Sequence, residues 1–231
     1  MPAFLELLEG LDVRIEPELL DLALTHRSYS YEHGQIPNNE RLEFLGDAVL
    51  SIVVTEYLYR AYPDFPEGRL AKLRAAVVSA VSLGDVARAH DVGAMVKLGK
   101  GEISTHGADK TSILADTMEA LIGAAYITDT AGARRLVDAV FRPVVDEAVE
   151  LGSGLDWKTA LQELVAANGL GSLGYEMSES GPDHDKTFTA WVVIGERGFQ
   201  PGSGHSKKHA EQIAAENAAR ALEAEGYQFE A

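Results

Sequence analysis

The chain has 231 residues, of which 46% are hydrophobic, a size that suits one large or two ordinary domains with a buried core. The absence of cysteine excludes disulfides and thiolate metal sites, no apolar run is long enough to span a membrane, and the N-terminus does not resemble a signal peptide, so we expect a cytoplasmic protein. The formal net charge of −16 argues against binding a polyanion through overall charge, so any nucleic acid must be held by local clusters.

The first 38 residues predict two short helices and a loop. Leucines recur at helical spacing up to His26. The polar stretch from Ser28 to Asn38, which contains Gly34 and Pro37, then ends the helical pattern.

Residues 39–60 predict one long helix with three carboxylates inside it. Glu40 and Glu43 are three residues apart, and Glu43 and Asp47 are four apart, so the three lie along one edge of the helix. Each such pair of like charges costs roughly 0.2–0.5 kcal/mol. A bound cation would explain the arrangement. The apolar side of this helix consists of Leu42, Leu45, Val49, Ile52 and Val53.

A second helix repeats this anomaly. Before it, residues 67–90 predict one long helix and residues 93–107 predict a glycine-rich loop. In the strongly apolar helix that follows, Asp116 and Glu119 are three residues apart and share one face. A further helix is expected at residues 131–150.

The spacing of apolar residues changes beyond residues 151–155, which contain Gly-Ser-Gly and are predicted to be a linker. Asp156 is typical of a cap for a helix at residues 157–167. Alternating apolar residues then predict strands near residues 175–180, 188–194 and 198–200, followed by a helix at residues 206–225. We therefore predict an all-α domain at residues 1–150 and a small α+β domain, in the order α-β-β-β-α, at residues 156–231.

The four carboxylates in the two anomalous helices would form an all-oxygen cluster if these helices pack side by side. Such a cluster suits Mg²⁺ or Mn²⁺ and suits zinc or iron poorly. A di-iron site is disfavoured because no Glu-x-x-His is present. The alternative is that these acids are solvated or paired with Arg and Lys. The residues concerned are Glu43, Asp47, Asp116 and Glu119.

The start of the last helix favours phosphate binding. A glycine-containing loop, a helix N-terminus and the lysines Lys207 and Lys208 lie together there. Lysine pairs are also common on solvated faces, so this feature by itself leaves both interpretations open.

The two anomalous helices contain the segments NERLEFLGDAVL at residues 39–50 and ADTMEALIGA at residues 115–124. The first closely resembles the signature motif of bacterial ribonuclease III, and the second is similar to that family's second acidic motif. Residues 156–225 resemble a double-stranded-RNA-binding domain, with DWKTALQELV at the first helix, GPDH in a strand loop and GSGHSKKHAEQIAAENAA at the last helix. The resemblance covers nearly the whole chain in the family's order.

The resemblance implies an all-α endonuclease domain that hydrolyses double-stranded RNA with Mg²⁺, for which Mn²⁺ can substitute. The products would be 5′-phosphate and 3′-hydroxyl ends with short 3′ overhangs, made during the processing of rRNA precursors and mRNA. It also implies a homodimer through the catalytic domain, in which each chain cuts one strand. The metal-binding and catalytic carboxylates would be Glu43, Asp47, Asp116 and Glu119.

Further residue roles follow from the same resemblance. Phe44 matches a dimer-contact position, and Glu40 and Glu67 match additional acidic positions near the family's site. The RNA-binding domain would read the shape of the duplex through two minor grooves and the phosphates between them. The implied RNA contacts are Thr159, Gln162, Glu163, His184, Lys207 and Lys208.

Two observations bear on how RNA is bound and whether it is cut. Glu211 occupies a position where many such domains have a third lysine, so we expect modest affinity and a shallow salt dependence for the isolated domain. The alternatives to cleavage are a non-cleaving RNA-binding protein on the same fold and a helical assembly factor with an acidic interface. The first predicts loss of a carboxylate, and all four are present.

Overall fold

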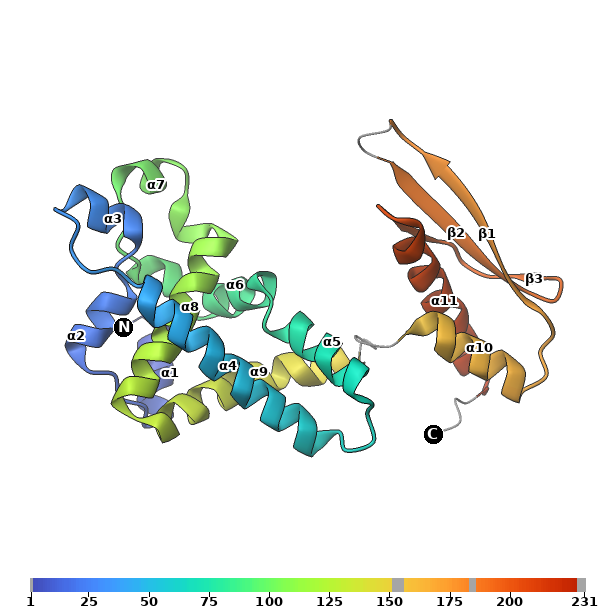
Figure 1. The fold of residues 1–231 in the computed structure, drawn as a ribbon, viewed down its shortest axis with the longest axis horizontal. Coiled ribbons are helices and arrows are strands. Elements are labelled where there is room, and N and C mark those ends of the chain that lie inside the picture. Colours follow the sequence, from blue (N-terminus) through green and yellow to red (C-terminus); the bar gives the residue numbers. More distant parts are fainter. Residues whose placement is uncertain (1, 151–155, 183–185, 228–231) are drawn as a thin grey trace. The chain divides into compact units, whose positions relative to one another are not determined.

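The computed structural model describes residues 2–150, 156–182 and 186–227. The chain divides into two compact units, Met1–Gly154 and Leu155–Ala231 (Figure 1). The linker predicted at residues 151–155 lies outside the described residues. No helix in the described part of the chain is long and apolar enough to cross a membrane.

The first unit is helical, as predicted. Short 3-10 turns occur at Val92–Met95 and Gly107–Asp109. Its helices are α1 (Ala3–Gly10), α2 (Pro17–Ala23), α3 (Arg27–Glu32), α4 (Glu40–Ala61), α5 (Glu67–Val77), α6 (Ala80–Ala89), α7 (Lys100–Ser104), α8 (Thr111–Thr128) and α9 (Thr130–Glu150).

Helix α8 is the centre of this unit. It packs against α4, α6 and α9, and Figure 1 shows α4 crossing it. Because α8 is covered on several sides, it is apolar almost all round. Its fully buried residues include Leu114, Met118, Leu121 and Ile122. Any charged residue on α8 is therefore held at the edge of a core.

The prediction of a single helix at residues 67–90 is wrong, because the structure has two helices there, α5 and α6. Ser79 begins the second one as its N-cap, and the Ser79 side-chain oxygen accepts a hydrogen bond from the Ser82 backbone N–H at 3.2 Å. This cap satisfies a helix-start donor and lets the chain change direction. Val81 continues the helical spacing of Leu73 and Val77, so one uninterrupted helix would bury it, but in the structure it is exposed.

The two stretches predicted as loops contain short helices that are bonded to each other. The Gly99 N–H donates to Ser28 Oγ at 2.9 Å, and the Lys100 N–H donates to Glu32 Oε1 at 2.8 Å. The His26 N–H also donates to the Lys97 carbonyl at 3.2 Å. These bonds hold α3 against the segment that includes α7.

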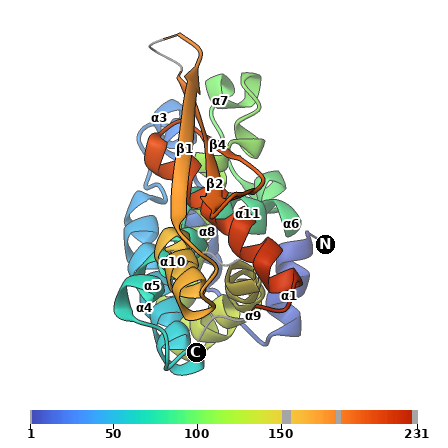
Figure 2. The ribbon, with the colours of Figure 1, turned by 90° about the vertical axis from the view of Figure 1, so that its right-hand side faces the viewer.

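The second unit has the predicted α-β-β-β-α order. It consists of α10 (Trp157–Ala167), β1 (Leu173–Ser180), β2 (Thr187–Ile194), β3 (Arg197–Gly198), β4 (Gly202–Gly204) and α11 (Lys207–Ala224). All pairs are antiparallel, and Figure 2 shows β2 between β1 and β4. The third strand was predicted near residues 198–200, but the structure has two short strands there, β3 and β4, with Phe199, Gln200 and Pro201 between them. Proline cannot donate to the strand ladder, which accounts for the break.

The sheet of this unit packs on α11 through small residues. Ala190 and Val192 of β2 are buried, as the alternation predicted. Ala210, Ala214 and Ala218 of α11 are also fully buried. A Cβ atom added at Gly202 would lie 2.3 Å from the Ala214 nitrogen, so β4 rests directly on α11. The start of α11 is thereby fixed relative to the sheet.

Candidate active site

The candidate site forms where α4 and α8 almost touch. A Cβ atom added at Gly46 of α4 would lie 1.8 Å from the carbonyl oxygen of Glu119, and one added at Gly123 of α8 would lie 2.3 Å from the carbonyl oxygen of Leu42. Only glycine fits at either position. The close crossing places Glu43, one turn before Gly46, beside the acidic residues of α8.

Three carboxylates meet at this crossing. One oxygen each from Glu43, Asp116 and Glu119 lies within 4.8 Å of the other two, and all three side chains are half-buried. Asp47 does not belong to this group of three. It is exposed on the next turn of α4, yet its charge is the largest neighbouring-charge influence on Glu119.

Burial and mutual repulsion make these carboxylates reluctant to ionise. Burial, followed by the charges of Asp47, Glu43 and Asp116, raises the pKa of Glu119 to about 7. Burial, followed by the charges of Asp116 and Glu40, also raises the pKa of Glu43. The crossing therefore concentrates negative charge that its surroundings compensate poorly.

This donor set fits a hard divalent cation. Three carboxylate oxygens converge, and the group that the structure assembles contains no histidine among the described residues. Oxygen-only ligands suit Mg²⁺, Mn²⁺ or Ca²⁺. A bound cation would hold all three groups ionised and offset the burial that raises their pKa values, together with the mutual repulsion of Glu43 and Glu119 with their neighbours. Of the four predicted carboxylates, Glu43, Asp116 and Glu119 thus converge, and Asp47 lies outside this group but close enough for its charge to act on Glu119.

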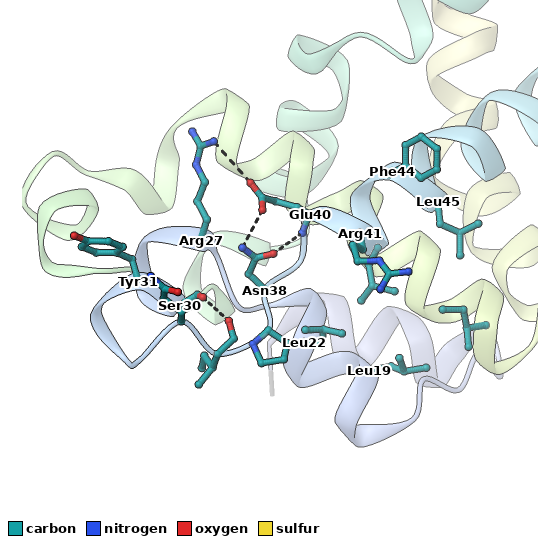
Figure 3. A pocket seen from close by; sticks show the side chains of 15 residues that line it. Leu19, Leu22, Arg27, Ser30, Tyr31, Asn38, Glu40, Arg41, Phe44 and Leu45 are labelled. Atoms are coloured by element: carbon teal, nitrogen blue, oxygen red, sulfur yellow. Dashed lines mark hydrogen bonds and ion pairs between the residues drawn. The ribbon is translucent and has the colours of Figure 1, made fainter.

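The other predicted positions in this unit lie apart from the group of three. Glu40 is bonded to Asn38 and paired with Arg27, as Figure 3 shows. Glu67 is exposed at the start of α5. Phe44 is 82% exposed and lines a cavity of about 1000 Å³ together with residues such as Leu19, Leu22 and Ile127. No contact joins Glu67 to the acidic group in the described part of the chain.

Sequence reasoning missed two residues beside the site. His26 is buried at the start of α3, and Arg27 follows it. The charges of both influence Asp116 and lower its pKa, against the larger effect of burial, which raises it. Nothing in the periodicity of residues 25–38 places them near α8. Long-range hydrogen bonds do so, among them those between α3 and the α7 segment and the bond from the Asn39 N–H to the Thr25 carbonyl at 3.0 Å.

In the second unit, the predicted RNA contacts are exposed on two helices. Thr159, Gln162 and Glu163 are all exposed on α10. Lys207 and Lys208 are exposed in the first turn of α11, where Ser206 caps the helix by accepting from the His209 N–H at 3.2 Å. The predicted contact His184 lies outside the described residues.

Glu211 is engaged within this unit. Lys158 of α10 donates to Glu211 of α11 at 2.5 Å, and the Lys158 ammonium lies 4.8 Å from the Tyr175 ring centre. One turn of helix separates Glu211 from Lys207. Glu211 is the residue for which the sequence predicts weaker RNA binding. In the structure its carboxylate also forms an ion pair with Lys158.

The fold and the site together define a class of protein. A helical domain assembles a carboxylate group suited to a metal ion, and a separate α-β-β-β-α domain presents lysines at a capped helix start, which suits phosphate. This combination is consistent with a metal-dependent nuclease joined to a nucleic-acid-binding domain.

Comparison with known proteins specifies the family. Residues 16–145 match the Ribonuclease-III-like family, and residues 157–222 match the double-stranded RNA binding motif. Ribonuclease 3 of Streptomyces coelicolor is 55% identical over 220 residues, covering 94% of this chain and 80% of the relative. Ribonuclease 3 of Thermobifida fusca is 56% identical over 220 residues, covering 95% and 92%.

A solved structure gives the same answer for the first unit. The nuclease domain of ribonuclease III from Campylobacter jejuni matches with a TM-score of 0.53 and 38% identity, covering 59% of this chain and 97% of that one. The chain belongs to the ribonuclease III family. It is an endoribonuclease that acts on double-stranded RNA and carries a double-stranded-RNA-binding domain, and its acidic group is consistent with a metal-dependent catalytic site.

Proposed function

We propose that Glu43, Asp116 and Glu119 hold Mg²⁺ for the hydrolysis of double-stranded RNA, with Asp47 as a fourth contributor and Mn²⁺ as a substitute. The observation that carries this proposal is the convergence of three half-buried carboxylate oxygens within 4.8 Å. Carboxylate-held magnesium keeps several waters and binds phosphate oxygens. When bound, it supplies an activated water for in-line attack and stabilises the departing oxygen.

The residues of the chain prepare this chemistry. The contact at Gly46 and Gly123 fixes α4 against α8, so the carboxylates are positioned before a cation or RNA arrives. Burial of Glu119 keeps water from screening its charge. Asp47, which is exposed, stands beside Glu119 and can reach a ligand that arrives from solvent.

We also propose that two copies of the chain act together, each cutting one strand. One acidic group per chain cannot serve two antiparallel strands at once, whereas a symmetric dimer carries two such groups. Phe44 projects from α4 beside the cavity lined by Leu19, Leu22 and Ile127, and a partner's Phe44 could enter that cavity. The C. jejuni structure concerns a region involved in dimer formation of its nuclease domain, which supports the proposal. Staggered cuts would leave 5′-phosphate and 3′-hydroxyl ends with short 3′ overhangs.

The second unit would bind the duplex by its shape. Thr159, Gln162 and Glu163 would meet one minor groove, His184 the next, and Lys207 with Lys208 the phosphates between them. Shape readout needs few cations, which reconciles RNA binding with a net charge of −16. We place the protein in the cytoplasm, where it would process rRNA precursors and mRNA. Residues 1–150 would be the catalytic domain and 156–231 the RNA-binding domain.

The test compares wild type with Glu119→Gln on an end-labelled RNA duplex, with and without Mg²⁺. Wild type should cleave only with the cation, and Glu119→Gln should lose about 100-fold or more in rate. Glu147→Gln, an equal charge change at an exposed position of α9, is the matched control and should cleave normally. Wild-type protein that fails to cleave with Mg²⁺ would refute the enzyme in favour of a non-cleaving binder. Undiminished activity of Glu119→Gln would refute the site.

A further inference from the structure

Arg27 stands at the rim of the acidic group with its guanidinium largely free. Its side chain is 73% exposed, and Arg27 Nη1 approaches Glu40 Oε1 at 3.9 Å (Figure 3). Exposed pairs at such a distance contribute little to stability. Arg27 nevertheless acts electrostatically on both Glu43 and Asp116, so its charge lies near the group. A weakly held cation beside a cluster of anions is poorly explained by folding stability.

The backbone that carries Arg27 is fixed although its side chain is not. Arg27 is the first residue of α3, which His26 caps by accepting from the Ser28 N–H at 3.2 Å. The Ser28 hydroxyl in turn accepts from the Gly99 N–H at 2.9 Å. The Cα atom of Arg27 is therefore anchored, whereas its exposed guanidinium makes a long contact of 3.9 Å with Glu40. This arrangement suits a group that engages a ligand on arrival.

Glu40 is arranged to hold Arg27 and is not part of the three-carboxylate group. Its Oε2 accepts from Asn38 Nδ2 at 3.0 Å, while Asn38 Oδ1 accepts from the Glu40 N–H at 3.2 Å. These reciprocal bonds tie Glu40 to the first turn of α4. The carboxylate oxygens of Glu40 thus face Asn38 and Arg27.

We propose that Arg27 binds a phosphate of the RNA strand that is being cut, and that Glu40 is a positioning residue for Arg27. The proposal rests on the function proposed above for the acidic group. RNA must bring phosphates to a site already rich in carboxylates, and the planar guanidinium is the side chain best matched to two phosphate oxygens. On arrival, the phosphate replaces the loose contact with Glu40.

The first test is Arg27→Gln in the full chain. Loss of a hydrogen bond to a charged group should lower kcat/KM by about 10- to 100-fold. Arg60→Gln is the matched control, because Arg60 lies on α4, is 75% exposed and pairs with the carboxylate of Glu56. It should cleave within about twofold of wild type. Arg27→Lys should recover part of the loss, since it restores the charge without the two-pronged geometry.

Salt dependence separates a phosphate contact from a structural role. In a Glu119→Gln background, where RNA is bound without being cut, adding Arg27→Gln should reduce the slope of log affinity against log salt by about one. Arg60→Gln should leave that slope unchanged. A fall in kcat/KM with an unchanged slope, or a fall of less than twofold, would overturn the phosphate contact.

The role of Glu40 is tested by combining substitutions. If Glu40 acts through Arg27, Glu40→Gln slows wild type but adds nothing to Arg27→Gln, and the Mg²⁺ concentration needed for half-maximal rate stays constant. Independent effects would overturn the positioning role of Glu40, and a raised Mg²⁺ requirement would show that Glu40 acts on the metal site instead. Failure of the proposed metal site would appear separately, as full activity of Glu119→Gln in a chain that keeps Arg27.

Discussion

Gly46→Ala tests whether the contact between α4 and α8 builds the site. The added methyl group would lie 1.8 Å from the Glu119 carbonyl oxygen and 2.5 Å from its carbonyl carbon. Real Cβ atoms essentially never approach another heavy atom within 3.0 Å, so the two helices must separate by about 1.2 Å. The atom that must move belongs to the backbone of α8, which is buried among α4, α6 and α9, so it cannot yield cheaply.

The expected cost follows from this displacement. Overfilling a packed interior costs about 1–3 kcal/mol, and a backbone clash belongs at or above the upper end. For a domain of this size, each kcal/mol lowers the unfolding temperature by about 2–4 °C, so a fall of about 6–12 °C is expected. Glu119 moves with its backbone, and a shift of about 1 Å at reacting groups costs about 100-fold in rate.

Thermal unfolding and single-turnover cleavage of a duplex measure both effects. Gly68→Ala is the matched control, because Gly68 lies in α5 with open space where its Cβ would be. That change should stabilise the protein by roughly 0.5–1 kcal/mol, since alanine loses less chain entropy than glycine in a helix. A Gly46→Ala protein with the unfolding temperature and cleavage rate of wild type would refute the inferred crossing.

Three more predictions concern charge and assembly. Without divalent cations, the unfolding temperature should fall as pH rises from about 4.5 to about 7. In this range the folded state keeps a proton on Glu119 that the unfolded chain has lost, because the pKa of Glu119 is raised to about 7 by folding. Glu119→Gln should therefore flatten the decline. Phe44→Ala should weaken the proposed dimer by about 1000-fold in sedimentation measurements, because each of two symmetric copies loses an aromatic contact worth about 2 kcal/mol. Glu211→Lys should strengthen duplex binding severalfold and steepen its salt slope by about one or more, because it adds a cation and releases Lys158.

Each of these predictions has a control and a contrary outcome. A pH profile of unfolding that Glu119→Gln leaves unchanged would show that another group titrates. Tyr59→Ala, an exposed aromatic at the other end of α4, should leave assembly unchanged, and equal effects of both variants would remove Phe44 from the contact. An unaltered salt slope in Glu211→Lys would place that position away from the phosphates.

The order of elements and the acidic residues were readable from the sequence because their signals are local. Apolar spacing defined α4 and α8, and carboxylates inside that spacing marked them as anomalous. The α-β-β-β-α order of the second unit came from a change of period from helical to alternating. Where a capping side chain competed with periodicity, as at Ser79, the cap prevailed and one predicted helix became two.

The composition of the candidate site was decided by tertiary structure alone. Local spacing groups Glu40, Glu43 and Asp47 equally, but the crossing angle and the contact at Gly46 bring only Glu43 of the three into the group with α8. Arg27 reaches the same place because α3 is bonded to a segment about 70 residues later in the chain. Sequence periodicity reports which face of its own helix a residue occupies. Which faces meet depends on long-range packing, and that packing brought three of the five acidic candidates on α4 and α8 together and placed Arg27 near them.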